Sequence, residues 1–152
     1  MLPTNLKHSV LACSLLAALL ASAGQAQAAC TGNTRISSVT TLSNLLQNKT
    51  VCFPATTVDP MTWQEKHVRV GAATTGALID FKRGPGHPVD PSETVGTWTV
   101  AGNNGGQQAA VTHDYGGGAT YTYTVHDNSD GTHSFCNGGQ EFITAIRAGP
   151  GC

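Results

Sequence analysis

The chain has few charged side chains. Charged residues make up 11% of its 152 positions, against about 25% in an average soluble domain. The formal net charge is only −1. This composition excludes a coiled coil stabilised by charged pairs, a basic nucleic-acid-binding tail and a disordered chain kept open by charge repulsion. We therefore expect a single folded domain and no nucleic-acid partner.

Long hydrophobic runs are also missing, except near the N-terminus. Lys7 precedes an apolar run over residues 10–20, and the small residues of Ala26-Gln27-Ala28 follow it. This order is typical of a secretory signal peptide, with cleavage after Ala28. The run is shorter than the roughly 20 residues that a membrane-spanning helix needs. We expect residues 1–28 to be a signal peptide and residues 29–152 to form one exported domain with no stable membrane span.

A lipoprotein signal is the alternative interpretation of this N-terminus, because Cys30 follows two alanines. Such a signal has an aliphatic residue at position 27, where this chain has Gln27. We therefore expect a protein that is periplasmic or extracellular without a lipid anchor.

Closely spaced cysteine pairs are absent, although residues 29–152 keep four cysteines: Cys30, Cys52, Cys136 and Cys152. With no C-x-x-C spacing, an even number of cysteines in an exported chain indicates two disulfides rather than a metal site. Three pairings are possible, and the spacing does not choose among them. In the chain-entropy model, a disulfide that closes a long loop of such a chain contributes roughly 3 to 4 kcal/mol to the free energy of unfolding.

Only one segment, residues 36–47, has the apolar spacing of an amphipathic helix. Thr34 or Ser37 is positioned to cap its start, and Asn48 to cap its end. The apolar residues at helical spacing are Leu42, Leu45 and Leu46.

After Lys49 the pattern changes to a period of two, in segments rich in Thr, Val, Ile and aromatic residues and bounded by Gly, Pro, Asn or Asp. Residues 128–131, Asn-Ser-Asp-Gly, form a typical hairpin turn. We expect eight strands, over residues 50–54, 62–70, 76–83, 94–101, 107–115, 119–127, 132–136 and 141–147.

Eight short antiparallel strands leave two exposed edges unless the sheet closes. We therefore predict a mainly β domain: an eight-stranded antiparallel up-and-down barrel, or a curled meander, with one N-terminal helix. A β-sandwich is the alternative. The one long connection, residues 84–93, contains three prolines. We interpret it as a fixed surface crossing, and a lid over the end of the barrel is the other possibility.

Three short segments carry a resemblance to a known family. They are Asn48-Lys49-Thr50-Val51, Trp63-Gln64-Glu65-Lys66-His67 and Gly96-Thr97-Trp98. Together with the order of features over residues 42–152, they resemble small bacterial exported proteins of the calycin, or lipocalin-like, type. The resemblance implies no particular ligand.

Aromatic residues are scarce, and most of them share a strand face with other apolar residues. Alternation places Trp98, His113, Tyr115, Tyr121 and Tyr123 inside the barrel. It also predicts an inward face for Ile79 and Phe81.

The strand over residues 62–70 has no clean apolar face. Trp63, Glu65, His67 and Arg69 share one side. If Trp63 points inward, the polar side chains on its face are buried, and buried charge must be paired or bound to something. The commoner arrangement, which we expect here, has Trp63 as an anchor and a solvated ladder of Glu65, His67 and Arg69 at the rim.

Two function classes follow from these residues. The first is a binding module that holds a small ligand or an envelope protein at the open end of the barrel. The second is a structural or interaction protein of the cell envelope whose barrel is filled. The ligand-binding candidates are Trp63, Glu65, His67, Trp98, His113, Tyr115, Tyr121 and Tyr123.

Metal and catalytic chemistry have weaker support. Three inward imidazoles, those of His67, His113 and His133, would suit zinc or copper if they converged. We interpret them instead as core or rim histidines. The chain contains no nucleophile elbow, H-E-x-x-H or phosphate-binding loop. We therefore assign no metal, cofactor or catalytic residue and expect no enzymatic activity.

Overall fold

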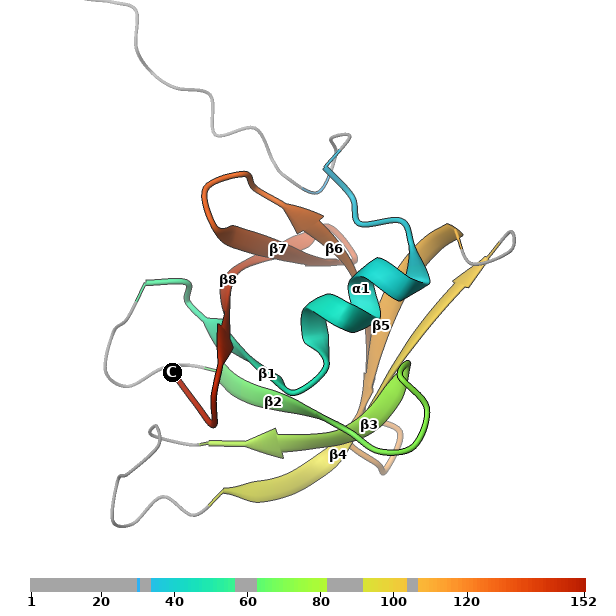
Figure 1. Ribbon diagram of the computed structural model, residues 1–152, viewed down its shortest axis with the longest axis vertical. Coiled ribbons are helices and arrows are strands. Elements are labelled where there is room, and N and C mark those ends of the chain that lie inside the picture. The colour runs from blue at the N-terminus through green and yellow to red at the C-terminus, as the bar shows by residue number, and fades with distance from the viewer. Residues whose placement is uncertain (1–29, 31–33, 57–62, 82–91, 104–106) are drawn as a thin grey trace, which may run out of the picture.

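A computed structural model describes residues 30, 34–56, 63–81, 92–103 and 107–152. Eight antiparallel strands, each paired with the next, form a barrel that closes where the last strand pairs with the first (Figure 1). The predicted up-and-down barrel with one helix is therefore confirmed. The elements are α1 (Val39–Leu46), β1 (Lys49–Phe53), β2 (Trp63–Arg69), β3 (Thr75–Asp80), β4 (Glu93–Asn103), β5 (Gln107–Asp114), β6 (Thr120–Asp127), β7 (Thr132–Asn137) and β8 (Gln140–Ala148).

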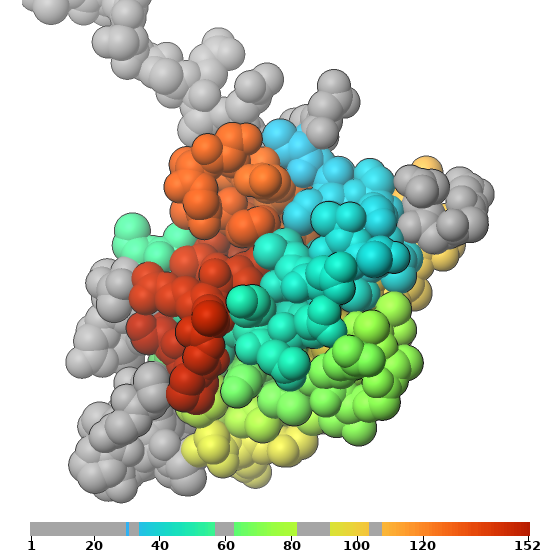
Figure 2. All heavy atoms as spheres, in the orientation of Figure 1, coloured from blue at the N-terminus to red at the C-terminus, as the bar shows by residue number. Residues whose placement is uncertain are grey.

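The helix α1 lies over one end of the barrel, in the middle of the ring of strands in Figure 1. Its apolar face is buried there, with Leu42 and Leu46 both 0% exposed. Figure 2 shows the atoms of α1 over this end, with those of the C-terminal segment to one side of them. We call the opposite end, where β1, β3, β5 and β7 end, the mouth.

The helix begins three residues later than predicted, because residues 34–37 form an extended segment instead. The backbone N–H of Ile36 donates to the carbonyl of Val125 at 2.8 Å, and that of Ala109 donates to the carbonyl of Ser37 at 2.8 Å. The segment thus lies between β5 and β6, beyond the end of their ladder at Val111 and Tyr123. Ser38 is the N-cap instead of the predicted Thr34 or Ser37.

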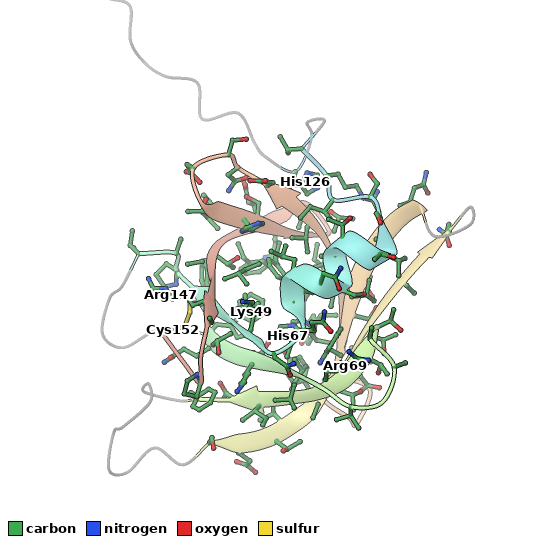
Figure 3. All side chains as sticks on the ribbon, in the orientation of Figure 1. Lys49, His67, Arg69, His126, Arg147 and Cys152 are labelled. Atoms are coloured by element: carbon green, nitrogen blue, oxygen red, sulfur yellow. A yellow bond between two sulfur atoms is a disulfide. The ribbon has the colours of Figure 1, made fainter. Side chains whose placement is uncertain are left out.

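Two disulfides join Cys30, which precedes α1, and the C-terminal Cys152 to strands of the barrel, as Figure 3 shows for Cys152. Cys30 is bonded to Cys136 on β7, and Cys52 on β1 is bonded to Cys152. Arg147 holds the same end of the chain, since its guanidinium donates to the carbonyl of Cys152 at 3.2 Å. Two disulfides indicate that the protein folds in an oxidising environment.

One prediction about strand faces is wrong. On β3 the inward residue is Leu78, which pairs with His67 and is 0% exposed. Ile79 pairs with Lys66 on the outer face, while Phe81 is buried beyond the strand end. The sequence pattern does not decide the inward residue here, because Leu78 and Ile79 are adjacent apolar residues and the alternation can be counted from either of them.

Gly76 allows the largest interior side chain to fit. It pairs with Trp98, whose indole N–H donates to the carbonyl of Val68 at 3.2 Å. A Cβ atom on Gly76 would lie 1.8 Å from that carbonyl oxygen and 2.8 Å from the indole nitrogen. Only glycine leaves room for this contact, which fixes Trp98 against His67.

Several expectations concern segments that the structure does not describe. The signal peptide at residues 1–28 and most of the long connection, residues 84–91, lie outside the described residues. Within the described part of the chain, no helix is long and apolar enough to cross a membrane.

Candidate functional site

The polar face of β2 points into the barrel. Trp63 contacts the rings of inward residues from β5, β6, β7 and β8, so Glu65 and His67 are carried inside by alternation. Glu65 is 3% exposed and His67 is 0% exposed. The expected solvated ladder is therefore wrong for these two residues, and of its members only Arg69 is exposed. Arg69 lies at the α1 end, where its Nε donates to the carbonyl of Gly71.

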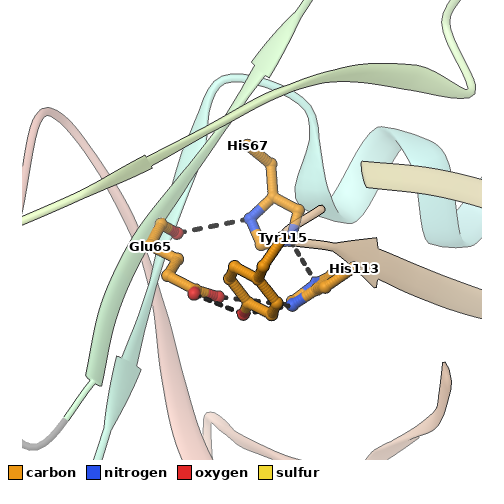
Figure 4. A network of polar contacts seen from close by, with 4 residues as sticks. All are labelled: Glu65, His67, His113 and Tyr115. Atoms are coloured by element: carbon orange, nitrogen blue, oxygen red, sulfur yellow. Dashed lines mark hydrogen bonds and ion pairs between the residues drawn. The ribbon is translucent and has the colours of Figure 1, made fainter. Parts of the chain in front are cut away.

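Four polar side chains, from β2, β5 and the residue directly after β5, form a connected cluster, which Figure 4 shows from close by. The Tyr115 hydroxyl donates to Glu65 Oε1 at 2.5 Å. Glu65 Oε2 lies 3.2 Å from His113 Nδ1 as an ion pair, and this oxygen has no hydrogen-bond partner among the described residues. The Nε2 atoms of His113 and His67 are 2.9 Å apart. We call Glu65, His67, His113 and Tyr115 the buried cluster.

The hydrogen-bond partners assign the proton positions in the buried cluster. His67 Nδ1 lies 3.3 Å from the backbone carbonyl of Glu65, which can only accept, so this nitrogen carries the hydrogen of a neutral imidazole. His67 Nε2 is then an acceptor, and His113 donates to it through its own Nε2.

The environment supports a neutral His67 and a protonated Tyr115. Burial lowers the pKa of His67 well below its usual value, and the charge of nearby His113 lowers it further, against the opposing hydrogen bond to the Glu65 carbonyl. Burial raises the pKa of Tyr115 above its usual value, as do the charge of Glu65 and the hydrogen bond to it. Burial, followed by the charge of Glu65, raises the pKa of Tyr123 to about 12.

Acidification from pH 7.5 to 5 is expected to lower the free energy of unfolding. Because the pKa of His67 is depressed in the folded state, the unfolded chain takes up this proton first as the pH falls below about 6.5. Stability is then complete above that pH and declines below it, by about 1.4 kcal/mol per pH unit for one proton. Urea unfolding at several pH values measures the slope.

The variant His67→Gln is the control for this pH dependence, and its slope should be shallower than that of the wild type. A remaining slope of the same sign is expected, since burial also lowers the pKa values of His126 and His133. Equal slopes for variant and wild type would contradict the assignment to His67.

Aromatic rings surround the buried cluster and fill the middle of the barrel. The Trp98 ring centroid lies 5.6 Å from that of His67, and the Trp63 centroid lies 6.0 Å from that of His113. Trp98 and Phe135 are 0% exposed. The middle of the barrel is therefore occupied by side chains, and the accessible aromatic surface lies at the mouth.

The structure brings together all eight residues that the sequence predicted as ligand-binding candidates. Four form the buried cluster, and the other four pack around it: Trp63, Trp98, Tyr121 and Tyr123. Tyr121 differs from its prediction, since it is 45% exposed at the mouth and not enclosed.

The three histidines considered as metal ligands do not all meet. His67 and His113 touch, but His133 pairs with Asp127 at the α1 end of β7. Among the described residues, no group of three or more His, Cys, Asp or Glu side chains is placed to hold a metal ion.

An open depression lies at the rim of the mouth, where β4 begins and β5 ends. Its lining residues are Thr94, Val95, Gly96, Thr97, Asp114, Tyr115 and Gly116. Gly96 allows the two strands to approach here, because a Cβ atom on it would lie 2.1 Å from the Asp114 carbonyl oxygen. The sequence did not predict this depression, and Asp114 was not among the predicted ligand-binding residues, although it adjoins Tyr115. No family model, curated protein or solved structure matches this chain.

Proposed function

We propose that the mouth of this barrel binds a small ligand. The observation that carries the proposal is the position of Tyr115. This residue is half-buried, lines the open depression, and has its hydroxyl held by the buried carboxylate of Glu65. A few fixed polar groups beside aromatic surface are typical of small-molecule sites.

The aromatic side chains of the mouth support the same proposal. Tyr121 is 45% exposed, and its ring centroid lies 6.0 Å from that of Tyr115. Trp63 is partly buried beneath them and packs against Phe53 and Phe142. Each of these rings is held in place by its neighbours. A ligand that contacts them therefore gains contact area while the side chains lose little conformational entropy.

The two disulfides and the N-terminal sequence support a periplasmic or extracellular location. We propose that residues 1–28 are removed on export and that the oxidised domain meets its ligand outside the cytoplasm. The calycin-like resemblance of the sequence remains part of this proposal.

Native mass spectrometry of the exported protein tests ligand binding. We expect an added mass that disappears on denaturation and is lost in Tyr121→Ser, which removes exposed aromatic surface at the mouth. The matched control is Ile143→Ser, because Ile143 is 47% exposed on the outer wall of β8. An adduct retained by Tyr121→Ser and lost from Ile143→Ser would place the ligand elsewhere.

A structural or interaction protein of the envelope is the second candidate. The filled middle of the barrel favours it, because Trp98, Phe135, Leu78 and both cluster histidines are fully buried. If wild type and both variants carry no adduct and have the same thermal stability with and without envelope extract, this second function replaces the first.

A further inference from the structure

Residues 34–37 form an extended segment, which we call the strap, between β5 and β6 at the α1 end of the barrel. On the β6 side, the Asp127 N–H donates to the carbonyl of Thr34 at 3.0 Å, and the strap donates in return through the Ile36 N–H. On the β5 side, the Ala109 N–H donates to the strap. The strap therefore supplies hydrogen-bond partners to two strands whose own ladder ends before this point.

Both ends of the strap are fixed to the rest of the molecule. Cys30, which precedes it, is bonded to Cys136 on β7, and α1 follows it. None of the strap side chains is fully buried, so opening the strap exposes less apolar surface than unfolding the barrel. Segments with few buried contacts open locally at a lower free energy than the whole fold. The two tethers keep an open strap beside β5 and β6, where it can close again.

His126 lies beneath the strap, as Figure 3 shows. Alternation places it on the outer face of β6, where it pairs with Ser134 on β7, and yet it is only 3% exposed. Its Nδ1 atom lies 3.4 Å from the Thr34 hydroxyl, and Arg35 pairs with it in an isolated antiparallel bridge. Its Nε2 atom lies 3.2 Å from the Thr124 hydroxyl. An outward side chain of the barrel is thus buried because the strap lies over it.

The strap also sets the charges around the His126 ring. Burial lowers the pKa of His126 below its usual value, and the charge of Arg35 lowers it further, against the opposing charge of Glu141 on β8. The neighbours of the ring on β6 and β7, Thr124 and Ser134, are uncharged. Both effects that disfavour the proton therefore depend on the closed strap, while the carboxylate that favours it belongs to the barrel and stays when the strap opens.

We propose that the strap is a pH-sensitive element of the fold: a proton taken up by His126 opens the strap while the eight-stranded barrel stays folded. The open form binds this proton more strongly than the closed form, so acid shifts the equilibrium towards opening. The closed form keeps its full advantage above about pH 6.5 and loses up to about 10-fold in population per pH unit below it. The strap lies at the end opposite the mouth, so the proposal does not depend on a ligand there.

Amide hydrogen exchange of the disulfide-bonded protein tests the proposal, with each rate corrected for the intrinsic effect of pH. The N–H groups of Ile36, Ala109 and Asp127 report on the strap, because each hydrogen bond joins it to β5 or β6. Their protection factors should fall at least about 3-fold between pH 7 and pH 5. At each pH they should stay below those of β1, a strand paired on both sides. Protection that does not change with pH, or that equals that of β1, would overturn the proposal.

Two matched variants assign the proton. His126→Gln removes the titrating ring and keeps a polar side chain beside Thr34, and its strap protection should not change between pH 7 and pH 5. His133→Gln is the control, because burial also lowers the pKa of His133, which lies on β7 at the same end of the barrel. The control should keep the wild-type pH dependence at Ile36 and Ala109. A strap that is merely weaker in a variant lowers protection equally at all pH values, so equal pH dependence in the two variants would overturn the assignment to His126.

Discussion

Replacing Cys52 and Cys152 together by alanine is expected to lower the free energy of unfolding by about 4 kcal/mol. The two disulfides interlace, so the remaining Cys30–Cys136 bond shortens the path between positions 52 and 152. Along that path the closed loop holds about 40 residues rather than about 100, and the chain-entropy model gives about 4 kcal/mol for it instead of about 4.7. Thermal unfolding should shift down by roughly 15 °C.

The matched variant is the double replacement of Cys30 and Cys136, which opens a loop of similar length. Because Cys30 also tethers residues 34–37 between β5 and β6, this variant should lose at least as much stability. The free energy of unfolding of a typical domain is about 5 to 15 kcal/mol. Removing both disulfides is expected to cancel most of it. Losses below about 1 kcal/mol in both double variants would show that the barrel does not depend on its disulfides.

The variant Glu65→Ala is expected to lose about 3 to 5 kcal/mol of stability, because it leaves a buried imidazole and a buried phenol without their partner. Glu65→Gln keeps the volume and an acceptor for Tyr115, so its loss should be smaller, about 1 to 3 kcal/mol. Urea unfolding at pH 7.5 measures both.

The control for this prediction is Glu141→Ala. Glu141 is exposed and accepts one hydrogen bond, from the Ser134 hydroxyl at 2.6 Å. Removing this carboxylate should cost about 1 kcal/mol or less, because solvent replaces much of what is lost. If Glu65→Ala lowers the free energy of unfolding no more than Glu141→Ala does, then the buried cluster contributes no more to stability than an exposed carboxylate.

The strands were predictable because each has a period-two pattern bounded by turn residues. The start of the helix was not, since residues 34–37 pair with the backbones of β5 and β6, and that partner is remote in sequence. The end of the helix was predictable to within one residue. The C-cap is Gln47 and not the predicted Asn48, which follows it with a φ of 58°, a conformation that asparagine tolerates.

The members of the candidate site were predictable by strand alternation, but their burial was not. Glu65 and His67 look like rim residues when β2 is considered alone, because an isolated strand does not show that His113 on β5 and Tyr115 just after it face them. Pairing across the barrel makes the buried charge tolerable. Asp114 was not predicted as a site residue because an outward carboxylate beside a turn has no distinctive sequence pattern.

The extended segment at residues 34–37 has a consequence for the order in which the protein folds. These residues are among the first to be synthesised, but their backbone partners, Ala109 and Val125, come much later. The bonds from Cys30 to Cys136 and from Cys52 to Cys152 likewise wait for the end of the chain. Pairings so distant in sequence form slowly. The barrel therefore cannot be completed while the last strands are missing, and the chain stays open until its synthesis is nearly finished.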